Sequence, residues 1–547
     1  LGIAMVLIAA IFLLNLHLTK RLERYLRKEL IHRTAEATDG FYRLSFDNLS
    51  ISFFKGELTL EGIKLCPDSV VFRDWERKDS LPSVYVTAEV GMVDFKGLNL
   101  TWRRSYKQLH FDSFEIRNPD IQVFNPYYST RAEVKERKEA EIKTLYEVVS
   151  PYINVLTVRM LNLENASVSY SVENPVSPIV YALNDVSFHA YGFRLDENSS
   201  ESGKLLYCDN FDFITKRSQT LLANNDFRLQ TDRILLSTED SIISISNITL
   251  TPQGELWGEQ KKRPDSYLNA LIRAIEVKGI QFRRENALNY LTARSLDIIS
   301  SDIQAFNLAG ESLPSAKKTE KKSLNEAEAD SLVRSLSLYE LISPVLHTVS
   351  IGTVGIGQAK LQYSFAVKDK IEVYKLANFD FQANDFRIDS VSETQRGFWY
   401  SRGFSFEATG IEGLMTARNH RFTVKRMTLD TESGDFNLER IRLYPLSVCG
   451  QNDYMAGSID TVGIRGLLYD KGISARLLKI DRPNLRYVLF SSFNKKDVKS
   501  VKPANSRVGV ESILNPFLRY FSVKRLSLNH AYVTVSYTHL TLPTILR

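Results

Sequence analysis

A spacing motif that recurs along the chain constrains the fold more than any other feature of the sequence. Residues 109–124, LHFDSFEIRNPDIQVF, and residues 156–170, LTVRMLNLENASVSY, share the spacing apolar-x-apolar-x-x-apolar-x-apolar with almost no common letters. Apolar residues at every second position are typical of a β-strand with one apolar and one polar face. The motif therefore predicts a one-sided β-sheet. Its fourteen copies begin at Leu44, Leu58, Leu109, Leu156, Tyr181, Leu206, Ile243, Ile275, Val349, Tyr374, Phe422, Phe436, Ile473 and Phe521.

The two-residue interruption inside each copy shifts the alternation by one position. Without a correction, the apolar residues that follow would point to the opposite face of the sheet. A β-bulge or a sharp bend at the interruption restores the common face, because one extra residue resets the phase. A tight hairpin between two very short strands is the alternative. Residue pairs that favour a turn or bulge are Asp47-Asn48, Glu61-Gly62, Asn184-Asp185, Asp209-Asn210 and Ser246-Asn247.

A larger period lies above this motif. LYEVVSPYINVLTV at 145–158 matches LYELISPVLHTVSI at 338–351, and Pro151, Pro344 and Pro516 each precede a long copy of the motif by five residues. Charged stretches at 131–144, 315–330 and 494–507 come before these prolines. We expect a solvated loop, a short helix that ends near the proline, and then new strands. In the long copies a Pro or Ala and further alternating residues follow; they run from Leu109 to Val123, Leu156 to Tyr170, Val349 to Tyr363, Ile473 to Tyr487 and Phe521 to Val535.

Repetition of this kind favours an array of modules over one compact core. The predicted order is a transmembrane anchor (1–18), an amphipathic juxtamembrane helix (19–39) and a first β-module (40–130). A charged loop with a short helix (131–155) leads to a second module (156–310). A second charged loop with a short helix (311–348) leads to a third module (349–490). The chain ends with a further loop and helix (491–520), the start of another module (521–535) and an out-of-pattern tail (536–547).

The first eighteen residues, LGIAMVLIAAIFLLNLHL, are apolar apart from Asn15 and His17. Their length is near the roughly 20 residues that a membrane-spanning helix needs. We expect an uncleaved anchor; the alternative is a cleaved signal peptide, which usually has a shorter apolar region and a small-residue cleavage site. The anchor residues are Leu1, Ile3, Val6, Leu7, Ile8, Ile11, Phe12, Leu13, Leu14, Leu16 and Leu18.

The segment after the anchor has helical periodicity. One face carries apolar residues and another carries cations, so the helix either lies along the membrane surface or continues the anchor out of the bilayer. Cations beside an anchor favour the cytoplasmic side, which leaves the orientation open. The apolar positions are Leu22, Tyr25, Leu26 and Leu30, and the cationic positions are Arg21, Arg24 and Lys28.

The sequence contains no arrangement of residues that indicates catalysis. The 70 basic and 64 acidic residues nearly balance, which argues against nucleic-acid binding. Cys66, Cys208 and Cys449 lie far apart, and no His pairs with another His or Cys at metal-ligand spacing. We therefore expect no catalytic residue, no metal and no cofactor, and a binding or structural role for the protein.

A one-sided sheet has to cover its apolar face, because large exposed apolar patches are rarely tolerated in water. The faces either close on one another as sandwiches or form a trough that an apolar ligand fills. Both arrangements give the same alternation along the sequence. The predicted anchor favours the trough, because lipid is the apolar ligand nearest to a membrane protein.

The first 125 residues resemble the AsmA-like envelope proteins of Gram-negative bacteria, in the style of members from the Bacteroidetes. The resemblance rests on the apolar N-terminus, on ATDGFYRLSFDNLSISFFKGELTLEGIKLCPD and on SVYVTAEVGMVDFKGLNLTWRRSYKQLHFDSFEIRNPDIQVF, and the repeats extend it weakly to about residue 535. The group includes the TamB-related proteins and is similar to the bridge-like lipid transfer proteins. It implies a mostly β chain with an N-terminal transmembrane helix. An elongated, curved antiparallel β-groove of repeated modules, with short helices between modules, would follow.

The same resemblance implies an inner-membrane, single-pass protein with its bulk in the periplasm, which carries phospholipid toward the outer membrane. The alternative is an anchored scaffold that assembles outer-membrane proteins through protein contacts. Either role allows an envelope protein partner and involves no nucleic acid. The candidate groove residues are Leu109, Phe111, Phe114, Ile116, Leu156, Val158, Leu161, Leu163, Val349, Ile351, Val354, Ile356, Phe521, Val523, Leu526 and Leu528.

Overall fold

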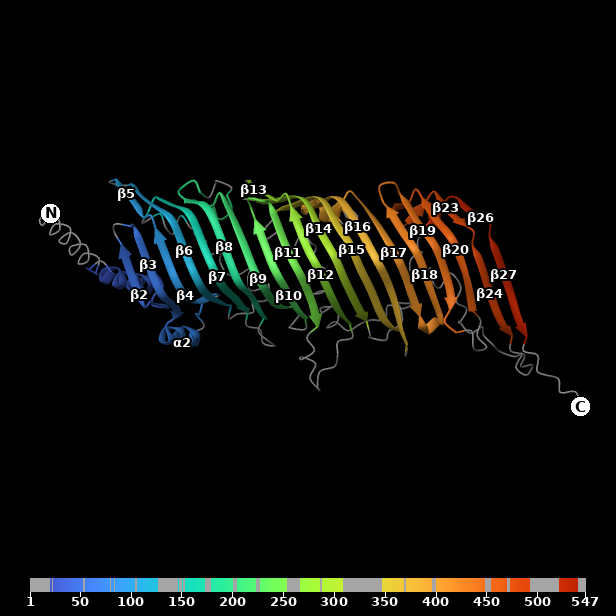
Figure 1. Ribbon diagram of the computed structural model, residues 1–547, viewed down its shortest axis with the longest axis horizontal. Helices are drawn as coiled ribbons and strands as arrows, with labels where there is room; N and C mark the ends of the chain where they lie inside the picture. The colour runs from blue at the N-terminus through green and yellow to red at the C-terminus, as the bar shows by residue number, and fades with distance from the viewer. Residues whose placement is uncertain are drawn as a thin grey trace, which may run out of the picture. The chain divides into compact units, whose positions relative to one another are not determined.

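The computed structural model of the chain is mostly β, with few helices (Figure 1). It describes residues 20–21, 23–52, 55–78, 80–82, 84–103, 106–125, 146, 150, 153–172, 179–199, 204–222, 227–252, 266–285, 288–307, 347–367, 370–395, 400–447, 454–469, 473–491 and 521–539. Two compact units divide the chain. The first unit comprises Leu1–Gly258 and Ala274–Thr292, and the second comprises Glu259–Arg273 and Ala293–Arg547.

The first unit holds a mixed β-sheet. Its helical elements are α2 (Ser69–Arg77) and the 3-10 turn η1 (Leu205–Tyr207). Its strands are β1 (Tyr42–Ser45), β2 (Asn48–Ser52), β3 (Glu57–Pro67), β4 (Tyr85–Lys96), β5 (Asn99–Arg103), β6 (Tyr106–Asn125), β7 (Val155–Val172), β8 (Ile179–Leu195), β9 (Asn210–Leu222), β10 (Phe227–Ser237), β11 (Ile242–Pro252) and β13 (Gln281–Glu285). Residues of both units form β12 (Ser266–Lys278) and β14 (Leu288–Asn307).

The second unit also holds a mixed sheet, with a small three-stranded sheet of β21, β22 and β25 beside it. Its helical elements are α6 (Ser390–Gln395) and the 3-10 turn η4 (Thr416–Arg418). Its strands are β15 (Thr348–Val367), β16 (Lys370–Ile388), β17 (Gly403–Met415), β18 (His420–Asp430), β19 (Asp435–Pro445), β20 (Tyr454–Arg465), β21 (Leu468–Tyr469), β22 (Ile473–Ala475), β23 (Leu477–Asp481), β24 (Asn484–Ser491), β25 (Phe521–Val523), β26 (Leu526–Asn529) and β27 (Tyr532–His539).

The expectation of a purely antiparallel sheet is wrong at specific joins. Most neighbours are antiparallel, but β6 pairs with β7 in parallel, and β22, β23 and β24 pair in parallel with β25, β26 and β27. A parallel neighbour needs a connection of a dozen or more residues, whereas a hairpin gives an antiparallel one. The segments between β6 and β7 and between β24 and β25 supply that length. They include the charged stretches 131–144 and 494–507, which lie outside the described residues, as 315–330 does.

The strands bend where a single residue takes a left-handed conformation. Gly62, Asp185 and Asn247 have φ of 63°, 51° and 50° inside continuous strands. A bend at these three interruptions is therefore confirmed, and the hairpin alternative is wrong for them. Asp47 instead lies between β1 and β2, Asn48 begins β2, and both strands pair with β3.

In the long copies the bend lies further along the strand than the first interruption. Asn118, Asn165 and Gln358 have φ of 51°, 54° and 56°, and each directly precedes the Pro or Ala of its copy. The pairing of β7 with β8 shifts register on both sides of Ala166. Asn tolerates this conformation better than most residues, because its short polar side chain bonds locally. These bends return the following apolar residues to the original face.

A helix covers residues 20–21 and 23–37, which overlaps the predicted juxtamembrane helix. Its Glu23 carboxylate accepts a hydrogen bond from the Ile51 backbone amide at 3.3 Å. The Arg27 guanidinium donates to the Phe46 and Asp47 carbonyls at 2.9 and 3.0 Å. The helix thus lies along the strand that begins the sheet and occupies edge groups that would otherwise pair with another chain.

Two predictions concern segments at the ends of the chain. Within the residues that the structure describes, no helix has both the length and the apolar character to cross a membrane. The anchor prediction, Leu1 to Leu18, falls outside those residues. Strand β27 pairs with β24 as far as His539, so four residues of the segment 536–547 continue the sheet.

Candidate functional site: the apolar faces of the sheets

One continuous row of apolar side chains crosses the sheet of the first unit. Each member pairs directly with the next on the neighbouring strand, so all of them share one face. The row takes one residue from each of nine strands, β2, β3, β4 and β6 to β11. Its members are Leu49, Leu60, Val93, Ile116, Leu163, Phe188, Phe213, Leu236 and Ile243.

Most of this row is only partly covered. Leu49 is buried, whereas the other eight members are half-buried. A side chain in a closed sandwich would normally lose nearly all of its exposure to the opposing sheet. One buried hydrophobic cluster of this unit involves Ala190, Cys208 and Phe211, next to η1, and another surrounds Phe41, whose ring stacks on Trp75. Burial in the first cluster raises the pKa of the Cys208 thiol to about 11, which favours its protonated form at neutral pH.

The second unit repeats the arrangement with two adjacent apolar rows. Each row takes one residue from each of eight strands, β15 to β20, β23 and β26. The first row is Ile356, Phe381, Phe406, Leu429, Phe436, Ile464, Leu478 and Leu526. The second row is Ala359, Phe379, Ala408, Met427, Leu438, Val462, Ile480 and Leu528.

The predicted groove residues fall on these faces in cross-strand pairs. The parallel join of β6 and β7 brings together Leu109 with Leu156, Phe111 with Val158, Phe114 with Leu161, and Ile116 with Leu163. The rings of Phe95 and Phe114 stack on the same face, 4.5 Å apart.

Exposure varies among the predicted residues. Val158, Val349 and Ile351 are 5%, 8% and 7% exposed, so they pack inside the unit instead of lining its surface. Val354, Ile356 and Val523 are half-buried, and Leu526 and Leu528 are 63% and 57% exposed. The Phe521 side chain lies outside the described residues, although its backbone pairs with Ile473.

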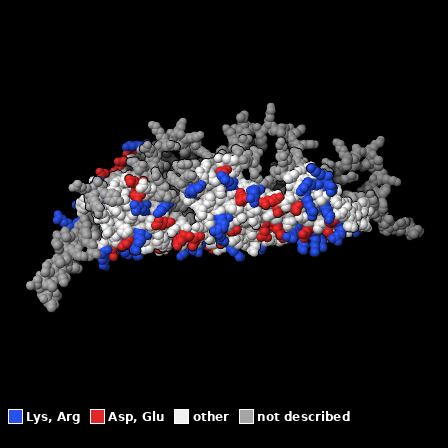
Figure 2. Space-filling model, turned by 90° about the horizontal axis from the view of Figure 1, so that it is seen from above, with Lys and Arg blue, Asp and Glu red and all other residues white. Residues whose placement is uncertain are grey.

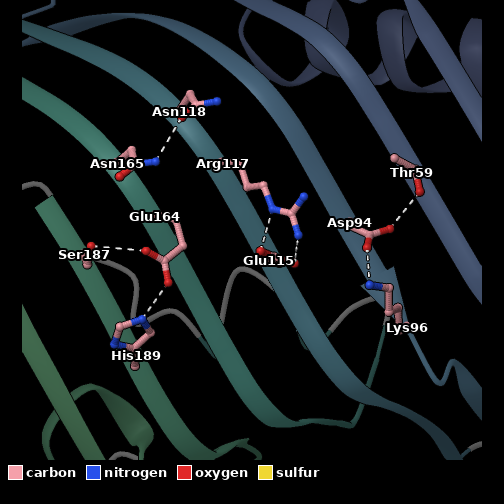
Figure 3. A network of polar contacts seen from close by, with 10 residues as sticks. All are labelled: Thr59, Asp94, Lys96, Glu115, Arg117, Asn118, Glu164, Asn165, Ser187 and His189. Atoms are coloured by element: carbon pink, nitrogen blue, oxygen red, sulfur yellow. Dashed lines mark hydrogen bonds and ion pairs between the residues drawn. The ribbon is translucent and has the colours of Figure 1, made fainter. Parts of the chain in front are cut away.

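The opposite face of the first unit carries polar side chains that satisfy one another (Figure 3). Asp94 accepts a hydrogen bond from Thr59 at 2.7 Å and pairs with Lys96 at 2.9 Å. Glu115 accepts two hydrogen bonds from Arg117. The carboxylate beside each base raises the pKa of Lys96 and of Arg117. These pairs stabilise the charged forms of Lys96 and Arg117.

The one histidine in this network does not activate a nucleophile. His189 Nε2 lies 2.7 Å from Glu164 Oε1, and the Ser187 hydroxyl donates to the other carboxylate oxygen at 3.2 Å. Nucleophilic catalysis would require the serine to contact the imidazole instead of the carboxylate. Figure 3 shows both side chains directed at Glu164, which therefore acts as an acceptor in a structural network.

Comparison with known proteins assigns no family. No family model matches the chain, and no curated protein matches it.

A depression of about 890 Å³ opens on the second unit. Its lining includes four members of the first apolar row, Ile356, Phe381, Phe406 and Leu429, together with acidic side chains that flank the row, Asp380, Glu407 and Asp430. In the described part of the chain, no three His, Cys, Asp or Glu residues lie close enough together to hold a metal ion. Figure 2 shows acidic and basic side chains interspersed on the visible face.

One acidic residue lies on the apolar face of the second unit, and the sequence analysis did not identify it. Glu372 of β16 is 2% exposed, and its Oε1 has no hydrogen-bond partner. Burial raises the pKa of this carboxyl above its usual value, against the opposing charge of Arg418. The hydroxyl of Tyr374 lies 3.4 Å from the other oxygen, and burial raises the pKa of that tyrosine to about 12.

The surroundings of Glu372 explain why its exposure is low. Met415 of β17 is 1% exposed, and His420, which pairs with Met415, is 6% exposed. The turn η4 follows β17 directly, and the Thr416 hydroxyl in it bonds to the Ile371 carbonyl at 2.8 Å. Alternation along β16 places Glu372 on the face of Tyr374 and Leu376, and its full burial there depends on this turn.

Proposed function

We propose that the protein carries lipid, with the acyl chains sheltered on the apolar faces of its sheets. The observation that supports this proposal is the uninterrupted nine-residue apolar row of the first unit, eight of whose members are half-buried. A purely structural face would be expected to bury such residues against a second layer. In this proposal the chain is anchored in the inner membrane and moves phospholipid through the periplasm toward the outer membrane.

The energetics of the apolar rows are consistent with lipid binding. A phospholipid has roughly 30 methylene groups in its two tails, and burial of each is worth about 0.8 kcal/mol. Contact with the apolar rows would offset most of the cost of leaving the bilayer. Movement along the face would then need no chemical step.

Two neighbouring residues of β19 allow a matched test. Leu438 belongs to the second apolar row, whereas Asn437, the residue before it, is exposed on the polar face. We expect Leu438→Asp to reduce the phospholipid that copurifies with the chain by about half, the share held by the second unit, because a carboxylate is strongly disfavoured against acyl chains. Asn437→Asp introduces the same charge and should leave the lipid content unchanged.

Mass spectrometry of lipid extracts from the purified full chain provides the measurement. Circular dichroism and thermal denaturation establish that both variants fold. If the unmodified chain carries no phospholipid after exposure to vesicles, lipid carriage is wrong. The scaffold alternative predicts equal behaviour of Leu438→Asp and Asn437→Asp in lipid content.

A further inference from the structure

Three cations meet where β18 and β19 bend. The pairs Val424 with Ile441 and Arg426 with Glu439 flank the bend, so Lys425 and Arg440 lie opposite each other between these pairs. Arg442 follows two residues later, opposite Thr423. Like charges directly opposite in a sheet destabilise it. The fold alone therefore gives no reason for this arrangement.

These cations lack the partners that equivalent residues have. Arg217, Arg440 and Arg482 all take left-handed conformations, with φ of 57°, 51° and 49°. Arg217 pairs with Asp185 at 3.3 Å, and Arg482 pairs with Asp460 at 2.9 Å. Among the described residues, Arg440 has no carboxylate within ion-pair distance.

The carboxylates near the bend are engaged elsewhere. Glu412 pairs with Arg421 at 2.5 Å, and Arg426 pairs with Glu407 at 2.8 Å. Glu439 lies 4.0 Å from the same Arg426. Lys425, Arg440 and Arg442 are exposed, and within the described structure none of the three forms an ion pair.

The backbone is hollowed beside these side chains. A depression of about 320 Å³ is lined by Gly410, Ile411, Glu412, Thr423, Val424, Lys425, Arg440 and Arg442. Gly410 has φ of 63°, and a Cβ at this position would lie 2.7 Å from the Cβ of Ala377. The glycine accommodates the Ala377 methyl group at this bend, and the depression lies beside it.

We propose that Lys425, Arg440 and Arg442 form a binding site for a phosphate group. A phosphate oxygen accepts hydrogen bonds from a guanidinium in a bidentate arrangement, and a lysine adds a point charge. A bound dianion would also remove the repulsion between Lys425 and Arg440. The phosphate comes either from a free phosphate ion or from the headgroup of an anionic phospholipid.

The principal variant is Arg440→Asn in the purified full chain. Asn suits a left-handed residue and occupies equivalent bends at Asn118 and Asn165, so the variant is expected to fold. Isothermal titration with inorganic phosphate should show binding that weakens at least about tenfold in the variant, since charged hydrogen bonds are lost. Arg217→Asn removes the same charge from the same backbone conformation and should bind phosphate normally.

A second arm separates the two sources of phosphate. Flotation with phosphatidylglycerol vesicles, compared with phosphatidylcholine vesicles, should show loss of binding in Arg440→Asn if the headgroup is the ligand. The double variant with Lys425→Gln and Arg442→Gln provides an independent test and should lose binding as Arg440→Asn does.

The outcomes are distinct from those of the lipid-content test. Binding of inorganic phosphate alone assigns the site to a free ion, and binding to anionic vesicles alone assigns it to a headgroup. Equal binding by the unmodified chain and Arg440→Asn in both arms overturns the site. Absence of binding to either probe by the unmodified chain overturns it as well. Neither result changes the amount of lipid held on the apolar face.

Discussion

The two units have a similar arrangement of strands and apolar rows, and they differ in the charged residues found at the bends and on the apolar face. Both have apolar rows that cross many strands and bends formed by left-handed residues. In the first unit the described bend residues are neutral or paired, as with Asn118 and Asn165 at 3.4 Å. In the second unit, Lys425 faces Arg440 at a bend, and Glu372 lies on the apolar face. The shared apolar rows support a common role for both units, whereas the facing cations and the buried carboxyl are specific to the second unit.

The largest expected effect tests whether both units hold lipid. Phe188→Asp in the first unit and Phe406→Asp in the second each place a carboxylate in an apolar row. We expect each variant to lose about half of the copurifying phospholipid and the double variant to lose nearly all of it, because charge is disfavoured beside acyl chains. Quantitative mass spectrometry of lipid per chain measures this. A single variant that loses everything would show that one unit alone holds the lipid.

A smaller effect compares a glycine bend with an asparagine bend. Gly410→Ala in the second unit adds a Cβ that meets Ala377, and it also places Ala at positive φ. We expect a loss of about 2–3 kcal/mol in the free energy of unfolding. Asn165→Ala in the first unit has the same conformational problem without the contact and should cost about 1 kcal/mol. Urea unfolding of both variants tests the difference; equal losses would show that the contact with Ala377 is relieved without cost.

The smallest expected effect concerns two buried carboxyls of the second unit with opposite pH dependence. The Ser392 hydroxyl and backbone amide lower the pKa of Asp389 to about 2, whereas burial raises the pKa of Glu372. Asp389 therefore contributes stability above a pH of about 4, which is lost as the pH falls toward 2. Glu372 has the opposite sign: its contribution is full at low pH and is lost as the pH rises above the usual value for Glu.

Two substitutions separate these contributions. Asp389→Asn should lower the free energy of unfolding at pH 7 by about 1–2 kcal/mol. Glu372→Gln should raise it by about 1 kcal/mol at pH 7 and make no difference near pH 4, because the buried carboxyl no longer ionises on unfolding. Chemical unfolding between pH 4 and pH 7 measures both. A Glu372→Gln variant that is less stable at pH 7 would contradict this assignment.

The sequence predicted the strands, their one-sidedness and several bends, because alternation and turn chemistry are local properties. It did not predict the parallel join of β6 and β7, since the period of a strand carries no information on its direction. The helix α2 was also missed, although Asp68 caps it by accepting hydrogen bonds from the Val70 and Val71 amides. That cap is a local signal, and a search for helix starts between strands would have found it.

For the candidate residues too, the sequence indicates local properties but does not predict contacts between distant strands. Ile116 and Leu163 were identified as apolar positions, but their direct contact across β6 and β7 depends on a register that spans 47 residues. Lys425 and Arg440 are unremarkable in the sequence and become a pair of facing cations only through the bend of β18 and β19. Glu372 follows the alternation of its strand, and its burial depends on the turn η4.

The parallel joins allow a chain of this type to change length by whole modules. At a parallel join, the first strand of the new module runs in the same direction as the last strand of the previous module. Strands β6 and β7 are an example. A tandem duplication of the gene segment between two such joins would therefore reverse no strand and leave the apolar rows in phase. Every module would keep its internal packing after such a duplication.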